Sequence, residues 1–502
     1  MAEGSPDIAI VGSGMGGATL ANALASSGAE ILVLERGTRL EAMPECRDSR
    51  AIFQRGHFRD PERWYDAAGN SFSPGNYYYV GGNSKFYGAV LTRLRERDFE
   101  ALEHFEGVSP AWPIRYADLR PYYDRAERQF RVRGNGAEDP TEPARDGPYP
   151  FPPVPDEPPI AEVRARLREI GMRPFSLPLG VDIDAWLSHG RTPWDAFPDT
   201  RSGKMDAETC AMLPALDHPN VRIETEARVT RLIAGPDRRI AAVEFEQRGE
   251  TRRIAPRLVA LCAGAVMSAA ILLASADEVD RDGLANRSGV VGRHFMNHNL
   301  TAMLTVDPRL RNDSVYQKTI GVNDYYFGDG GSGPPLGNVQ LLGRVGAPIL
   351  KAELKLVPEW ALALLTDHAV DWLMMSEDLP DPANRVRLDG RRIVMEWRRT
   401  NMEAHRRLIA RMRERFKAAG FPLAMTKAFD RRTPSHQCGT VRFGADPAHS
   451  ALDPFCRAHD HANLFVVDAA FMASSAAVNP ALTIAAQALR TADHILATDI
   501  AA

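Results

Sequence analysis

The residues between Asp7 and Glu35 constrain the fold more than any other part of this chain. An apolar run over 8–11 predicts a buried parallel strand, the pattern Gly12-x-Gly14-x-x-Gly17 predicts a tight turn, and the small residues of 18–26 predict a helix. A second apolar run over 31–34 predicts the next strand. This order of strand, turn, helix and strand is typical of a dinucleotide-binding unit, so we expect an α/β protein (α+β overall) with a Rossmann-like domain.

Each glycine of the turn has a separate expected role. The first permits the turn, the second lets a pyrophosphate approach the backbone, and the third lets helix and strand pack closely. The N-terminus of the helix then faces the phosphates. Glu35 ends the second strand, 18 residues beyond Gly17, where its carboxylate can accept the ribose hydroxyls of an adenine dinucleotide. The alternative is a glycine-rich turn without a dinucleotide, and the acid at this spacing argues against it.

Length and charge limit the remaining possibilities. A chain of 502 residues exceeds the usual size of one hydrophobic core, so we expect two or more closely packed domains. The formal net charge of −4 offers no basis for binding nucleic acid or an anionic membrane, because those partners need clustered positive charge. We therefore expect a small substrate that is not strongly charged.

The five cysteines predict a reducing environment. They are scattered and lack C-x-x-C spacing, which is typical of free thiols and argues against a disulfide framework and against a zinc or iron–sulfur site. We expect no metal. Because the first strand begins by Ile8, we expect neither a signal peptide nor a twin-arginine segment, and hence a cytoplasmic location.

One apolar run has the length of a membrane span. Residues 258–276 carry no charge over 19 positions. They divide better into a buried strand (258–262), a small-residue turn (263–265) and a helix (266–275), because a glycine after five residues fits a dinucleotide fold and interrupts a span.

Two further regions have recognisable periodicity. The first predicts helices over 116–130, 160–170 and 206–216, a Pro/Gly-rich connector over 134–159, and strands over 220–232, 240–247 and 252–262 that return to the first sheet. The second predicts a mainly antiparallel sheet with strands over 300–306, 339–345, 372–377, 385–388 and 393–397, covered by a helix over 402–419. Asp389-Gly390 predicts a hairpin. Residues 311–335, with Tyr316, Tyr325, Tyr326 and Phe327, form either a mobile lid or an ordinary surface loop.

Two further motifs lie outside this first unit: a pair of glycines, and a set of polar residues near the C-terminus. Gly81-Gly82 lies between aromatic residues, so its backbone can lie against a flat ring, or it forms a simple turn. Near the C-terminus, His436 precedes a predicted strand over 464–467 that ends in Asp468, and Asn479-Pro480 precedes a helix over 481–497.

On these residues the chain resembles the glucose-methanol-choline family of flavin-dependent oxidoreductases. The resemblance covers nearly the whole length, and His436 with Asp468 and Asn479-Pro480 is its most specific part. Ser376–Arg385 and Ser474–Pro480 are most similar to the bacterial branch near pyranose 2-oxidases and glycoside 3-oxidases.

The resemblance implies FAD and a set of site residues. It places His436 and Asn479 at the reacting end of the flavin, where an imidazole can take a hydroxyl proton and an amide can orient the alkoxide. The implied cofactor-binding residues are Gly12, Gly14, Gly16, Gly17, Glu35, Arg36, Gly81, Gly82, Asn83, Ser84, Val229, Gly264, Asp468, Ala469, Asn479 and Pro480.

The chain departs from the family pattern at two places. Covalent pyranose oxidases carry a histidine shortly after the paired glycines, whereas this chain has Lys85-Phe86-Tyr87, so we expect non-covalent FAD. Ala473 stands where family members commonly have proline, which affects local packing.

These observations predict two domains, each built from separate segments of the chain. Residues 1–90, 205–298 and 430–502 are assigned to the FAD-binding domain, and 91–204 with 299–429 to a substrate-binding domain. The expected reaction is oxidation of a secondary hydroxyl of a sugar or glycoside, at C3 or C2, to the ketone. The alternatives are oxidation of aliphatic or aromatic primary alcohols and a non-redox, oxynitrilase-like lyase. Oxygen, a quinone or a partner protein would re-oxidise the flavin.

Overall fold

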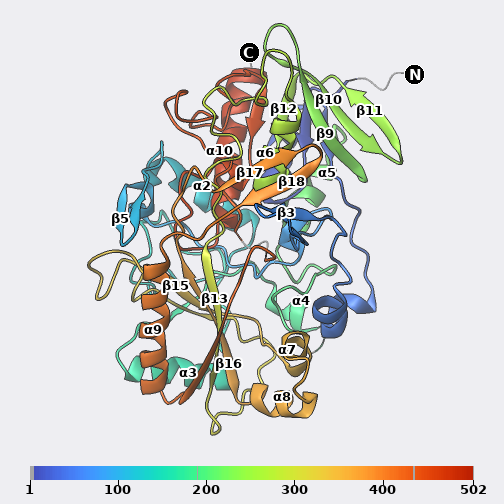
Figure 1. The fold of residues 1–502 in the computed structure, drawn as a ribbon. Helices are drawn as coiled ribbons and strands as arrows, with labels where there is room; N and C mark the ends of the chain where they lie inside the picture. Colours follow the sequence, from blue (N-terminus) through green and yellow to red (C-terminus); the bar gives the residue numbers. More distant parts are fainter. Residues whose placement is uncertain (1–4, 189, 191, 434–435, 501–502) are drawn as a thin grey trace.

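A five-stranded parallel sheet forms the centre of the upper part of the molecule (Figure 1). The computed structural model describes residues 5–188, 190, 192–433 and 436–500. The sheet has the order β20-β12-β1-β2-β8. Its strands are β1 (Ile8–Val11), β2 (Ile31–Leu34), β8 (Val221–Glu224), β12 (Leu258–Leu261) and β20 (Leu464–Val466). The first two strands and β12 are apolar throughout and fully buried, as expected for a parallel sheet covered on both faces.

Among the described residues, five helices surround this sheet. They are α1 (Met15–Leu24), α2 (Tyr116–Gln129), α5 (Leu213–Leu216), α6 (Ala265–Ala274) and α10 (Ala481–Ile495). Two of them, α1 and α6, consist of small and apolar residues. Helix α10 packs between α1 and α2, while α6 contacts the neighbouring antiparallel strands. The helix expected over 206–216 forms: a π-helical turn over Glu208–Met212 runs directly into α5, and Pro214 lies in the first turn of α5, where its missing N–H costs little.

The strand expected over 220–232 is two strands in different sheets. Glu226 has a φ of 56°, a left-handed conformation that ends β8, and β9 (Ala227–Ala234) starts in a new direction. Strand β9 pairs with β10 (Ile240–Gln247), and β10 pairs with β11 (Glu250–Ile254), so these three form their own antiparallel sheet. Of the strands expected to return to the first sheet, only β8 and β12 join it.

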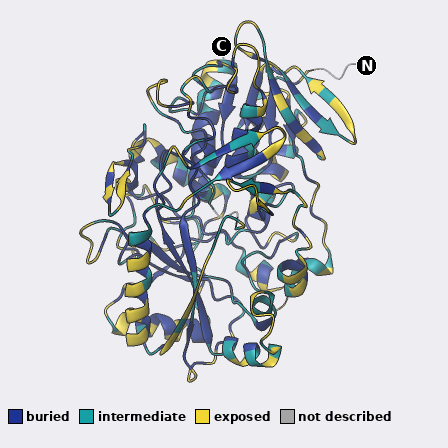
Figure 2. Ribbon diagram, viewed as in Figure 1, coloured by how far each residue is buried: buried dark blue, intermediate teal, exposed yellow. Residues whose placement is uncertain are grey.

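A six-stranded sheet dominates the lower part of the molecule. Its order is β19-β13-β16-β15-β14-β7, and all its pairs are antiparallel. The strands are β7 (Phe175–Ser176), β13 (Asn299–Val306), β14 (Ile320–Val322), β15 (Asn338–Leu341), β16 (Ala369–Ser376) and β19 (Leu423–Ala428). Helices α3 (Pro158–Glu169) and α9 (Met402–Ala418) contribute to the core on one of its faces. The inner strands are almost wholly buried, whereas the outer side of α9 is exposed (Figure 2).

The predicted hairpin forms but belongs to another sheet. Strands β17 (Arg385–Asp389) and β18 (Arg392–Glu396) pair across Asp389-Gly390. They join β3 (Trp64–Asp66) and β4 (Ser71–Phe72) in a four-stranded sheet, and Val386 and Ile393 pack against α6. The expectation of one continuous sheet over 299–400 was therefore wrong at this hairpin, because its apolar face is buried against the dinucleotide-binding part.

The segment expected to be a loop over 311–335 is mainly irregular, but most of it is buried and it contains one strand. Strand β14 runs through it, and Tyr316, Tyr325 and Tyr326 are all at most 5% exposed. The three tyrosines are therefore buried in the core, whereas residues 329–333 form an exposed tip. The remaining elements are β5 (Leu102–His104), β6 (Gly107–Ser109), α4 (Ile183–Leu187), α7 (Ala347–Glu353) and α8 (Glu359–Thr366).

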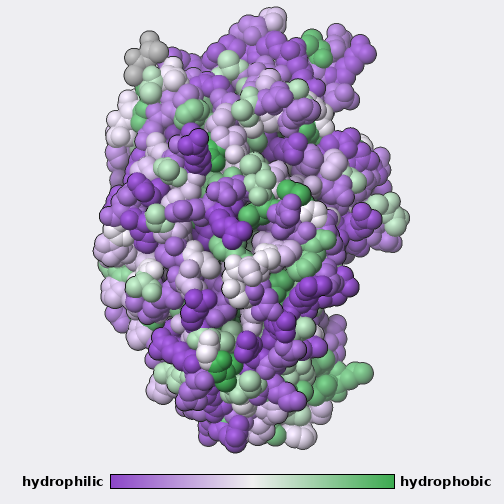
Figure 3. All heavy atoms as spheres, turned by 90° about the vertical axis from the view of Figure 1, so that its left-hand side faces the viewer, coloured by the Kyte–Doolittle hydropathy of each residue, from purple (hydrophilic) through white to green (hydrophobic). Residues whose placement is uncertain are grey.

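The surface shows no continuous apolar band on the face seen in Figure 3, where hydrophobic residues are interrupted by hydrophilic ones. None of the helices among the described residues is both long enough and apolar enough to cross a bilayer. The uncharged run over 258–276 consists instead of β12, a turn and α6.

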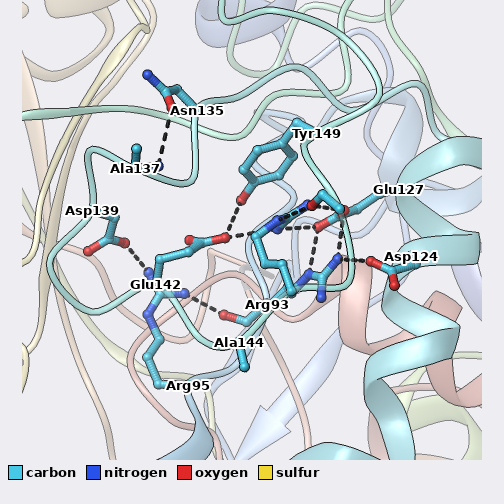
Figure 4. A network of polar contacts seen from close by, with 12 residues as sticks. Arg93, Arg95, Asp124, Glu127, Asn135, Ala137, Asp139, Glu142, Ala144 and Tyr149 are labelled. Atoms are coloured by element: carbon cyan, nitrogen blue, oxygen red, sulfur yellow. Dashed lines mark hydrogen bonds and ion pairs between the residues drawn. The ribbon is translucent and has the colours of Figure 1, made fainter.

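A buried ion network attaches the connector over 134–159 to α2 (Figure 4). The Glu127 carboxylate accepts hydrogen bonds from Arg93 at 2.8 Å and from Arg145 at 3.0 and 2.5 Å. Both arginines also have a second acidic partner, Asp124 for Arg93 and Glu142 for Arg145. Because the Arg93 and Glu127 side chains are 0% and 2% exposed, these charges are stabilised by one another rather than by water.

We expect Glu127→Ala to destabilise the protein by about 3 kcal/mol or more, because it leaves two buried guanidinium groups short of a carboxylate. Asp493→Ala is the matched control, since it breaks the Arg125–Asp493 pair whose side chains are 40% and 41% exposed and which contributes at most about 1 kcal/mol. Thermal unfolding followed by circular dichroism compares the two variants. Equal melting temperatures would contradict the structural role of the network.

Candidate active site

The glycine turn between β1 and α1 packs closely against neighbouring backbone. Gly12 has a φ of 98°, and a Cβ atom there would lie 2.5 Å from the carbonyl oxygen of Cys262. A Cβ on Gly16 would lie 1.8 Å from the carbonyl oxygen of Val467, and one on Gly17 would lie 2.0 Å from that of Gly12. Gly12 and Gly16 therefore require glycine for packing against the ends of β12 and β20, and Gly17 requires it for packing within the turn.

Gly14 differs from the other glycines of the turn, because a Cβ atom there would meet nothing within 4 Å. It is the N-cap of α1, and no side chain caps the free N–H groups of that helix end. Open space in front of uncapped N–H groups is what a pyrophosphate needs. The packing roles expected for Gly12 and Gly17 agree with these distances, and the contact of Gly14 with a pyrophosphate stays a prediction.

The second glycine motif lies against the first. Gly81 and Gly82 both have positive φ, and the Gly81 N–H donates to Ser13 Oγ at 3.1 Å. A Cβ on Gly82 would lie 3.4 Å from the Cα of Gly14. The side chains of Asn83 and Ser84 hold local backbone: Asn83 Oδ1 accepts from the N–H of Tyr77, and Ser84 Oγ accepts from that of Ala207.

Glu35 lies at the end of β2, as expected, and is only 5% exposed. Its carboxylate accepts from the Ser13 N–H at 3.1 Å, the Ser13 hydroxyl at 2.6 Å and the Gly37 N–H at 2.8 Å. Burial raises the pKa of Glu35, although these donors lower it. The acid thus fixes the glycine turn directly, and its expected contact with ribose stays a prediction.

Arg36 and Val229 have other neighbours. The Arg36 guanidinium stacks on the Tyr78 ring at 3.6 Å and pairs with Glu62. Val229 is buried in β9, two residues beyond Ala227, whose N–H donates to the Glu35 carbonyl at 2.9 Å. Val229 therefore lies near the end of β2, while Arg36 is engaged in local contacts.

The acid after β20 organises the opposite side of the turn. Asp468 accepts from the Gly264 N–H at 2.9 Å, from the Ser268 hydroxyl at 2.5 Å and from the Ala470 N–H at 2.7 Å. Burial raises its pKa. Gly264 has a φ of 88° and open space at its Cβ position. The buried Ala469 accepts the N–H of Gly439 through its carbonyl, and Pro480 is the N-cap of α10.

These residues form a cradle that fits an adenine dinucleotide such as FAD. The uncapped α1 terminus and the open position at Gly14 suit the diphosphate, and the backbone of Gly82 borders the same space. FAD would be held there by main-chain groups of the glycine turn, with the Gly81-Gly82 segment on one side and the Gly264–Asp468 contact on the other.

The two predicted catalytic residues contact each other. Asn479 Nδ2 lies 3.2 Å from His436 Nε2, and both side chains are partly exposed. The pKa of His436 is well below its ordinary value of 6.5, mainly because burial penalises the charged ring, with further lowering by the positive charge of Lys318. The imidazole is therefore neutral near neutral pH and able to accept a proton.

No local sequence pattern indicated a second histidine at this site. His298 Nδ1 lies 2.8 Å from His436 Nδ1, and His298 Nε2 lies 2.8 Å from the carbonyl oxygen of Ser475. An antiparallel bridge between Met296 and Cys438 places residues 298 and 436 opposite each other. Only a signal for this pairing, over 138 positions of sequence, could have identified His298 beforehand.

The backbone around the histidine pair is unusual. His298 and His436 have φ values of 55° and 63°, so both leave the extended conformation at the point where they face each other. Asp378 holds the first segment through the N–H groups of Asn297 and His298, each at 2.9 Å, and also accepts from the Ser475 hydroxyl at 3.2 Å.

The position of a covalent flavin link in other proteins is occupied by an ion pair here. Lys85 is buried, and its Nζ lies 2.9 Å from Asp206 and 2.8 Å from Glu208. Ala473 is 5% exposed and packs in the main core. Among the described residues no group of histidine, cysteine or acidic side chains is arranged to hold a metal ion.

Comparison with known proteins agrees with this geometry. Residues 190–300 and 380–488 match the two GMC oxidoreductase family models, and residues 10–53 match the NAD(P)-binding Rossmann-like domain. The chain is 29% identical to 6'''-hydroxyparomomycin C oxidase of Streptomyces lividus over 99% of its own length and 93% of that protein. It is 28% identical to paromamine 6'-oxidase of Streptomyces fradiae, over 97% and 91% of the two chains.

A solved structure supports the fold over the whole chain. Pyridoxine 4-oxidase from Mesorbium loti superposes with a TM-score of 0.67 at 18% identity, covering 98% of this chain and 99% of that one. This likeness concerns the fold. The two matched GMC oxidoreductase models and the full-length relatives show that the chain belongs to the GMC oxidoreductase family, FAD-binding flavoproteins whose members oxidise CH–OH groups of alcohols and sugars.

Proposed function

We propose that this protein oxidises a hydroxyl group of a sugar or glycoside, with His436 as the base and Asn479 as the group that holds the reacting oxygen. The observation that carries the proposal is the 3.2 Å contact between Asn479 Nδ2 and His436 Nε2 beside the dinucleotide cradle. One substrate oxygen placed at this contact meets both a proton acceptor and a hydrogen-bond donor.

His436 and Asn479 have different roles at that oxygen. Oxidation removes a proton from the hydroxyl group and a hydride from the carbon that carries it. The neutral imidazole of His436 takes the proton, and the Asn479 amide donates to the oxygen as negative charge develops there. FAD, when bound, supplies the acceptor for the hydride. Since the pKa of His436 is low, its proton is easily returned to water after the reaction.

The six-stranded sheet offers the polar surface that a carbohydrate requires. Val339 and Leu341 point to the face covered by α9, so Gln340 between them lies on the other face, across from Leu373. Gln340 is 1% exposed, and its Oε1 has no hydrogen-bond partner among the described residues. Phe429 packs on this same face, seven residues before His436. A buried acceptor on this face suits a sugar hydroxyl.

The position of oxidation has two candidates. The resemblance to pyranose 2-oxidases and glycoside 3-oxidases favours a ring secondary hydroxyl, at C3 or C2, and this is the position we propose. The names of the two relatives give positions 6' and 6''', which makes position 6 the second candidate.

We expect anaerobic addition of a suitable pyranose or glycoside to bleach the bound flavin, because the base and the amide act on a carbohydrate hydroxyl. A panel of monosaccharides, aminoglycosides, benzyl alcohol and short aliphatic alcohols tests this, and mass spectrometry with NMR locates the new carbonyl. A ketone at C3 or C2 supports the proposed position, and an aldehyde at position 6 supports the second candidate. Bleaching by simple alcohols alone contradicts the carbohydrate substrate, and bleaching by none of the compounds favours a lyase.

We propose that FAD is bound without a covalent link, because Lys85-Phe86-Tyr87 supplies no histidine and Lys85 is paired with two acids. Acid precipitation of the purified protein should then release the yellow colour into the supernatant. Absorbance of both fractions at the flavin bands measures the release. Flavin that stays with the washed pellet would show that a covalent bond exists.

We expect His436→Ala to retain FAD and to slow flavin reduction by roughly a hundredfold or more, the usual contribution of a general base. Asn479→Ala should have a similar but smaller effect, because a water molecule can replace part of its hydrogen bonding. His449→Ala is the control, since that side chain is 80% exposed. Stopped-flow absorbance under anaerobic conditions gives the rates. Parental rates in both site variants would remove His436 and Asn479 from the mechanism.

A further inference from the structure

The contacts of His298 determine which of its ring nitrogens carries a proton. His298 Nε2 lies 2.8 Å from the carbonyl oxygen of Ser475, which can only accept a hydrogen bond, so this nitrogen must be an N–H donor. A neutral histidine has a single ring N–H. His298 Nδ1 is then an acceptor, and the nitrogen that faces it at 2.8 Å, His436 Nδ1, must be the donor.

The ring nitrogens of His298 have two neighbours, and neither of them is a carboxylate. Among the described residues its ring nitrogens contact only His436 and the Ser475 carbonyl. The nearby carboxylate of Asp378 accepts from the main-chain N–H of His298 at 2.9 Å rather than from the ring. The buried Lys318 places a positive charge in the same region, where its effect reaches His436.

We infer that His298 is a positioning residue that fixes the tautomer of the base: it holds the proton of neutral His436 on Nδ1, so that Nε2 stays free to take the proton of the substrate. The inference deepens the proposed function and rests on it for the identity of the base. Asn479 Nδ2, at 3.2 Å from His436 Nε2, is a donor and thus agrees with an unprotonated Nε2.

The same contacts link the two catalytic side chains to each other. His298 is bonded to His436 on one side and to Ser475 on the other, and Ser475 lies four residues before Asn479 in one buried segment. When Nε2 of His436 gains a proton, its Nδ1–H donates to His298 from a charged ring, and this hydrogen bond becomes stronger. His298 therefore keeps Nε2 of His436 unprotonated before the reaction and stabilises the protonated ring after it.

The decisive measurement needs neither substrate nor turnover. A long-range hydrogen–nitrogen correlation spectrum of the holoenzyme labelled with ¹⁵N-histidine distinguishes protonated from unprotonated ring nitrogens. The signals absent from the spectrum of His436→Gln belong to His436. We expect them to show a proton on Nδ1 and none on Nε2. A proton on Nε2 in the parental protein would overturn the inference, whatever the variants do.

Two substitutions then test the role of the acceptor. His298→Phe keeps a ring but removes the acceptor, so we expect a mixed or reversed tautomer of His436 and flavin reduction at least about tenfold slower, with unchanged FAD content. His298→Asn places an amide oxygen near the position of Nδ1, and we expect it to restore the parental tautomer and most of the rate. Parental tautomer and rate in His298→Phe would overturn the inference.

His405→Phe is the matched control for the loss of a buried histidine. His405 lies in α9, and its ring nitrogens are 2.8 Å from Thr301 Oγ1 and 3.0 Å from Ser376 Oγ, both in the six-stranded sheet. These contacts do not involve His436. This variant should keep the tautomer and the reduction rate. An equal change in His405→Phe and His298→Phe would overturn the specific role of His298. If no carbohydrate reduces the flavin of the parental protein, the proposed function fails, and the nitrogen spectra still decide the tautomer.

Discussion

The whole structure depends on three backbone segments that meet without room for a side chain. The turn after β1 contacts the ends of β12 and β20, and a Cβ atom on Gly12 or Gly16 would overlap the carbonyl oxygens of Cys262 or Val467. These strands lie more than two hundred residues apart in the chain. Because each strand ends at the turn, the residues that follow it, Gly264 and Asp468 among them, have fixed positions around the space in front of α1.

This arrangement of the strand ends determines where the candidate catalytic groups lie. The segment that leaves β20 passes Asp468 and reaches Asn479 at the start of α10, while His298 immediately precedes β13 of the six-stranded sheet. Asp378 accepts hydrogen bonds from both segments. The site thus lies where the parallel sheet and the antiparallel sheet approach each other, and one buried carboxylate joins the two parts at that point.

Local sequence signals predicted much of the fold, because several elements are specified by neighbouring residues. The unit β1-α1-β2, helix α9 and the hairpin at Asp389-Gly390 follow from periodicity and turn chemistry. The errors concern associations over long distances: the hairpin packs on α6, and β14 pairs inside a segment that looked irregular. His436 and Asn479 were found through family motifs, whereas His298 depends on a bridge between Met296 and Cys438 that no local pattern reveals.

His298 can decide the tautomer of His436 because the two neutral tautomers of a histidine differ little in free energy. A low pKa makes His436 neutral, but it does not choose which nitrogen keeps the proton. Leaving a buried donor without a partner costs about 1–3 kcal/mol, which corresponds to a bias of roughly 5- to 150-fold between the two forms. A single acceptor at Nδ1 is therefore enough to decide whether the nitrogen beside Asn479 can act as a base.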